Sequence, residues 1–108
     1  MFTANTMSCL TEAVGLALPG AGTSPAVSSQ RIRDAKETGR AVMDLIERGV
    51  TARQIVTEAS LRNALAVDVS LGGSTNTVLH LLAIAQEAEI DLTMADIGKV
   101  SAETPHLT

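Results

Sequence analysis

The chain has 108 residues, of which 45% are hydrophobic, and a formal net charge of −4 at pH 7. Its eight basic residues are scattered from Arg31 onward and its one aromatic residue is Phe2, so it lacks both the basic stripe and the stacking platform that nucleic-acid binding needs. A secretory signal requires basic residues near its start, and none precedes Arg31. His80 interrupts the longest apolar stretch, so a membrane-spanning segment is not predicted either. We therefore expect a cytoplasmic chain without membrane association.

The first predicted helix covers residues 4–18. This stretch contains good helix formers, and the pattern stops at Pro19-Gly20. Apolar side chains recur at steps of three and four residues, namely Met7, Leu10, Val14 and Leu18. Residues 20–29 are Gly, Ala, Thr, Ser and Pro with one Val, which indicates a loop.

A second helix is predicted to run to Arg48. Ser28 or Ser29 could cap its start, and Gly49 stands in the expected terminating position. Gly39 weakens its middle. Its apolar side consists of Ile32, Ala35, Val42, Leu45 and Ile46.

Two capping signals follow in close succession. Residues 51–54 fit a capping box for a short turn of helix, and Thr57 can cap a longer helix that ends at Gly72-Gly73. The apolar positions of the longer helix are Leu61, Ala64, Leu65 and Val69. Residues 67–71 alternate enough to form a strand instead, and this alternative stays open.

The last part of the chain predicts two more helices. A strongly apolar one runs from about residue 74 to residue 89, and Thr93 with Asp96 starts a short one before Pro105. The fold class is therefore mostly α for the chain taken alone, within one domain at most over residues 1–108.

The most suggestive local feature is the pair of glycines that precedes the apolar helix. Two glycines let the backbone approach a ligand closely, and free amides at a helix start attract anions such as a carboxylate or phosphate. We therefore take Gly73, Ser74, Thr75 and Asn76 as candidates for the wall of an active site. The alternative is a plain turn between helices with Ser74 as N-cap. The pattern is not a phosphate-binding P-loop, because no Lys follows the glycines.

Polar residues also lie along that helix and at the start of the chain. Asn76, His80 and Glu87 share one helical face, which could line a site, although a His there is more often a packing residue. Thr3, Asn5, Thr6 and Cys9 form a polar helix entry that could border a cofactor. The alternative for this entry is a set of capping side chains with a small buried thiol. One cysteine cannot by itself hold an iron–sulfur cluster or a structural zinc.

Three segments carry a family resemblance: residues 1–13 (MFTANTMSCLTEA), 15–20 (GLALPG) and 71–85 (LGGSTNTVLHLLAIA). Through them the sequence resembles the dihydroxy-acid dehydratases, and the resemblance spans essentially the whole chain. Sugar-acid and phosphogluconate dehydratases share the Gly-Gly-Ser-Thr-Asn helix start but usually differ in the first segment. Those enzymes, or a non-catalytic helical interaction module, are the alternatives.

The resemblance implies an enzyme that dehydrates 2,3-dihydroxy-3-methyl carboxylic acids to 2-keto acids in valine, isoleucine and leucine biosynthesis. In that family an iron–sulfur cluster acts as Lewis acid on the leaving hydroxyl, magnesium binds the carboxylate end and a serine removes a proton. A homodimer is implied as well. The small-molecule dihydroxy acid would be the partner of the parent enzyme.

The same resemblance implies that no catalytic residue and no metal ligand lies in this chain. A cluster cysteine of the family precedes the position of Met1, and Cys9 matches a different cysteine that is not a ligand. The chain would then be an internal piece of a layered α/β N-terminal domain, truncated at both ends and inactive alone. It would bind no cluster or magnesium by itself. Thr3, Asn5 and Thr6 would lie next to the cluster.

Overall fold

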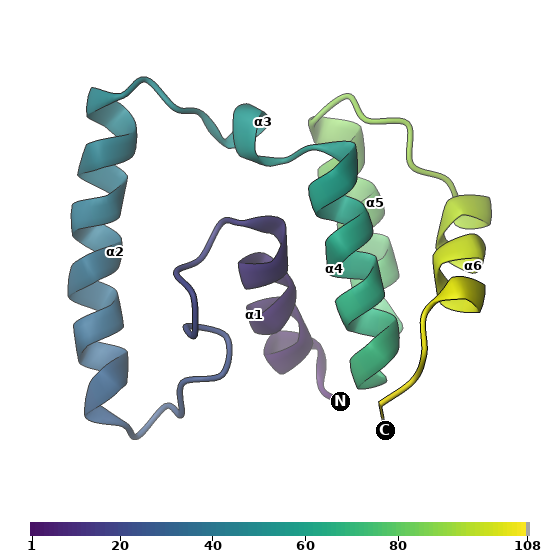
Figure 1. Cartoon of the computed structure of the whole chain (residues 1–108), viewed down its shortest axis with the longest axis horizontal. Coiled ribbons are helices and arrows are strands. Elements are labelled where there is room, and N and C mark those ends of the chain that lie inside the picture. The colour runs from purple at the N-terminus through teal and green to yellow at the C-terminus, as the bar shows by residue number, and fades with distance from the viewer. Residues whose placement is uncertain (108) are drawn as a thin grey trace.

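The computed structural model describes residues 1–107 and shows six helices and no strand within that range (Figure 1). The helices are α1 (Thr3–Val14), α2 (Ser29–Glu47), α3 (Ala52–Ile55), α4 (Glu58–Leu71), α5 (Asn76–Glu87) and α6 (Met94–Glu103). The prediction of a mostly α chain is confirmed. None of these helices is both long enough and apolar enough to cross a membrane.

Capping side chains define the helix starts at the predicted places. Ser28 accepts a hydrogen bond from the second amide of α2, at 3.1 Å. Thr57 and Thr93 form reciprocal capping boxes at the starts of α4 and α6. At α3 the Gln54 side chain accepts from the Thr51 amide at 2.8 Å. Each bond satisfies a backbone amide that has no partner within its own helix.

Two predictions about helix extent are corrected by the structure. The first helix ends at Val14 rather than residue 18, because Gly15 takes a left-handed conformation with φ 97°. Residues 67–71 are the last turns of α4, so the strand alternative is wrong. The helix wins there because the buried side chains of α4 recur with a period of 3.6 residues, and Gly72 then ends it in a left-handed conformation.

The hydrophobic core is built around α4, which α1, α5 and α6 all contact. Its buried side chains are Leu10, Val14, Val56, Leu61, Ala64, Leu65, Leu81, Ala85, Ile97 and Val100. The second predicted helix is absent from this list. Figure 1 shows α2 beyond α1, on the side away from α4, and Ile32 and Ile46 on its predicted apolar side are 64% and 65% exposed.

Candidate functional site

The start of α1 meets the turn between α4 and α5. Thr3 and Thr6 are one turn apart on α1, so both face the segment at residues 73–76. The hydroxyls of Thr3 and Ser74 are 2.8 Å apart, although the two residues are 71 positions apart in sequence. The Asn76 side-chain amide donates to the Thr3 hydroxyl at 3.0 Å. The two candidate segments thus lie together.

Thr6 stabilises this contact from the buried side. Its side chain is 0% exposed. Its hydroxyl donates to the Phe2 carbonyl at 2.9 Å and accepts from the Ser74 amide at 3.2 Å. The hydroxyl therefore both donates and accepts within the protein, and Thr6 supports the turn.

The start of α5 agrees only in part with the prediction that Ser74 is its N-cap. Ser74 accepts from the Asn76 amide at 3.3 Å, as a capping side chain would. The N-cap position itself is Thr75, whose side chain makes no capping bond and is exposed. Thr75 and Asn76 consequently present polar side chains at the surface, while Ser74 is half-buried beneath them.

Gly73 makes the close backbone approach that the glycine pair predicts. A Cβ atom at Gly73 would lie 1.8 Å from Asp68 Oδ1 and 2.7 Å from Thr6 Cγ2. Such distances are far below van der Waals contact, so no other residue type fits without movement. The approach is to the protein's own side chains and brings α1, α4 and α5 together at one point.

Asp68 also belongs to this site, although it was not among the residues predicted from the sequence. Its side chain is 7% exposed, and its Oδ2 lies 2.7 Å from the Thr77 hydroxyl oxygen, within hydrogen-bonding distance. Burial raises the pKa of Asp68, and the hydrogen bond with Thr77 lowers it by less. A signal was present: Asp68 continues the apolar positions of Leu61 and Leu65 along one face of α4, where a carboxyl must be buried.

We call this set of residues the polar junction. Its members are Thr3, Thr6, Asp68, Ser74, Asn76 and Thr77. Asp68 and Thr77 form its buried end, and Thr3 and Asn76 form the end nearest the surface. The junction can orient the start of α5 and display hydroxyl and amide groups there.

Other predicted residues lie outside the polar junction. Asn5 is exposed, and so are His80 and Glu87 on the outer face of α5. The alternative of His80 as a packing residue is not supported within residues 1–107, where its side chain is exposed. That the face of α5 with Asn76, His80 and Glu87 lines a site stays a prediction.

Cys9 lies on the part of α1 that faces the following loop. Its thiol donates to the Gly22 carbonyl at 3.7 Å, and the Glu12 carboxylate accepts from the amides of Gly20 and Gly22. Within residues 1–107 no three side chains of His, Cys, Asp or Glu lie together as a possible metal site. The expectation that Cys9 is not a cluster ligand stays a prediction.

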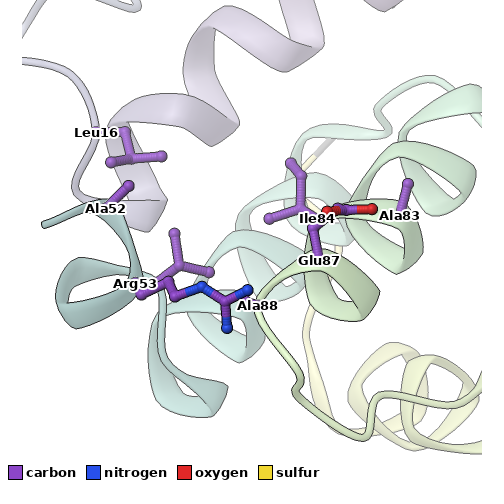
Figure 2. A pocket seen from close by; sticks show the side chains of 8 residues that line it. Leu16, Ala52, Arg53, Ala83, Ile84, Glu87 and Ala88 are labelled. Atoms are coloured by element: carbon purple, nitrogen blue, oxygen red, sulfur yellow. The ribbon is translucent and has the colours of Figure 1, made fainter.

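An apolar hollow of about 360 Å³ lies near the other end of α5. Figure 2 shows Leu16 and Ala52 on one side of it and Ala83 and Ile84 on the other. Its charged lining residues are Arg53 and Glu87. This hollow lacks the hydroxyl and amide groups of the polar junction, which we take as the candidate site.

The chain is similar to known proteins over nearly its whole length. Residues 1–108 match the family described as dihydroxy-acid/6-phosphogluconate dehydratase, N-terminal. Proteins named dihydroxy-acid dehydratase from Caldanaerobacter subterraneus, Pyrococcus furiosus and Methanoregula boonei are 57%, 56% and 53% identical to this chain over 107 residues. Each match covers 99% of this chain but only 19–20% of the relative, so the chain spans about a fifth of their length.

Proposed function

Since the chain belongs to the dihydroxy-acid/6-phosphogluconate dehydratase N-terminal family, we propose that it is a segment of a dihydroxy-acid dehydratase. This hydro-lyase would convert 2,3-dihydroxy-3-methyl carboxylic acids to 2-keto acids in branched-chain amino-acid biosynthesis. The observation that carries the proposal is the identity of 53–58% over nearly the whole chain to proteins of that name. The opening segment, which favours the dihydroxy-acid branch, supports it further.

The proposal includes an iron–sulfur cluster and magnesium in the whole enzyme, a cytoplasmic location and a homodimer. As the family resemblance implies, the ligands of the cluster and of magnesium and the catalytic serine would come from other parts of the enzyme. The contribution of this chain would be to shape the substrate site. Thr3 and Asn5, at the start of α1, are the candidates for lying beside the cluster, with Thr6 supporting them.

The part of the chain that would face the substrate is the segment from Gly73 to Asn76. Gly73 lets α1, α4 and α5 meet closely, and the polar junction fixes Ser74 from below. Thr75 and Asn76 are left with exposed polar side chains at the start of a helix. Hydroxyl and amide groups next to the positive end of a helix dipole suit the carboxylate of a dihydroxy acid.

A segment exchange tests the proposed function. In the Caldanaerobacter subterraneus dihydroxy-acid dehydratase, the 107 matched residues are replaced by those of this chain. We expect this chimera to dehydrate a 2,3-dihydroxy-3-methyl acid at a rate within about tenfold of the unmodified enzyme, because volume-conserving changes are well tolerated in packed interiors. The same exchange with the Pyrococcus furiosus segment is the control.

Two results would contradict the proposal. One is a chimera that melts like the control but does not dehydrate the dihydroxy acid. The other is a chimera that fails to fold where the control folds. Because the family description also includes 6-phosphogluconate dehydratase, this sugar acid is assayed in parallel, and activity on it alone would establish the alternative.

The substitution Thr75→Val tests the substrate-facing segment in the same chimera. It keeps the shape of the side chain and removes an exposed hydroxyl that makes no capping bond. We expect turnover to fall by about tenfold or more with an unchanged melting temperature, because a lost hydrogen bond to a charged group has this magnitude. Ser74→Ala, which removes the bond to Thr3, should lower the melting temperature as well. Normal turnover in both variants would show that the segment is only structural.

A further inference from the structure

At the buried end of the polar junction, the Thr77 hydroxyl has one proton but lies close to two hydrogen-bond acceptors. The Thr77 hydroxyl lies 2.7 Å from Asp68 Oδ2 and also within hydrogen-bonding distance of the Ser74 carbonyl oxygen. A hydroxyl carries a single proton, and a carbonyl oxygen can only accept. A single proton shared between the two acceptors would give only a bifurcated bond with poorer geometry. Both contacts can be full hydrogen bonds only if the carboxyl group of Asp68 supplies the second proton.

We propose that Asp68 is a neutral carboxylic acid that donates to Thr77 and thereby positions the turn that carries Ser74. The Thr77 hydroxyl then donates to the Ser74 carbonyl oxygen, so that one chain of bonds runs from α4 through the first turn of α5 to the turn. Asp68 is in this sense a positioning residue. Its role in catalysis rests on the proposed function, whereas its protonation does not.

The surroundings of the second carboxyl oxygen support the neutral form. Asp68 Oδ1 is buried and has no hydrogen-bond partner among the described residues. It lies where a Cβ atom at Gly73 would be, and the Gly73 amide donates to the Asp68 backbone carbonyl oxygen at 2.9 Å instead. Burying one unpaired oxygen of a neutral carboxylic acid costs far less free energy than burying a carboxylate charge with only one of its oxygens hydrogen-bonded. Burial also raises the pKa of this carboxyl group.

The proposal explains why three elements meet at Gly73. Asp68 Oδ1 occupies the space that a side chain at residue 73 would need, and Oδ2 fixes Thr77 on α5. One carboxyl group therefore sets both the approach of the turn to α4 and the orientation of the start of α5. Ser74 in turn reaches Thr3 and Thr6 on α1.

Infrared spectroscopy tests the protonation directly. In the chimera at neutral pH, a protonated buried carboxyl group gives a carbonyl band distinct from that of ionised carboxylates. We expect a difference spectrum between the unsubstituted chimera and its Asp68→Asn variant to show loss of this band. A difference spectrum that shows loss of an ionised carboxylate instead would overturn the proposal.

Kinetics test the positioning role. Asn at position 68 can donate to Thr77 as a neutral acid does, so Asp68→Asn should keep kcat/KM within about twofold. Asp68→Ala and Thr77→Val, which break the chain of bonds, should lower kcat/KM by about tenfold in molecules that remain folded. Equal loss in Asp68→Asn and Asp68→Ala would overturn the inference. An inactive unsubstituted chimera would overturn the proposed function alone, because the infrared band still tests the protonation of Asp68.

Discussion

Replacing Gly73 with alanine is expected to lower the free energy of unfolding of the chain by about 3 kcal/mol. The added Cβ would meet Asp68 Oδ1 at 1.8 Å and Thr6 Cγ2 at 2.7 Å, and both atoms belong to buried residues that are fixed by hydrogen bonds. The turn, α1 or α4 must therefore move. Urea denaturation followed by far-ultraviolet circular dichroism measures the loss.

Gly39→Ala is the matched control for this substitution. Gly39 lies in α2, and nothing lies within 4 Å of the position of its Cβ. Alanine there should raise the free energy of unfolding by about 0.5–1 kcal/mol, because it restricts the unfolded chain and favours the helix. A double-mutant cycle with Asp68→Ala should show that the cost of Gly73→Ala falls when the carboxyl is removed. Equal effects of alanine at positions 73 and 39 would contradict the steric argument.

Leu65→Ala is expected to cost about 3 kcal/mol of unfolding free energy, through lost burial and the cavity left behind. Leu65 is 1% exposed and belongs to the core that α4 shares with α1, α5 and α6. Leu79→Ala on α5 removes the same atoms from a side chain that is 66% exposed, and should change the stability by less than about 0.5 kcal/mol. The same urea titration measures both. Similar losses in the two variants would show that α4 is not the centre of the core.

The sequence predicted the helices well where local chemistry decides them. Thr57 and Thr93 indicate helix starts in the sequence because their capping bonds involve residues only three positions away. The end of α1 was missed because Gly15 lies inside an apolar repeat that continues to Leu18, and only the left-handed conformation of the glycine shows the break. Local patterns do not rank two such competing signals.

The candidate site was predicted in its parts but not in its assembly. Spacing indicated Thr3 and Ser74 separately, whereas their hydrogen bond depends on how α1 packs against α4 and α5. Asp68 escaped selection because its surroundings in sequence are apolar, and its role follows from Thr77 and Gly73 in three dimensions. The exposure of α2 could not be predicted from a local pattern either, because an apolar stripe on a helix does not indicate whether another element packs against it.

The contact between Thr3 and Ser74 also sets an order of events during synthesis. Of the six helices described here, α1 leaves the ribosome first, yet the hydrogen-bond partners of its polar residues are made 68 to 73 residues later. Closing so long a loop has an entropic cost that only the completed core can offset. Until the start of α5 has been made, Thr6 lacks its bond with the Ser74 amide, although α4, which α1 also contacts, has already been made. The first helix of the chain is therefore among the last to reach its final environment.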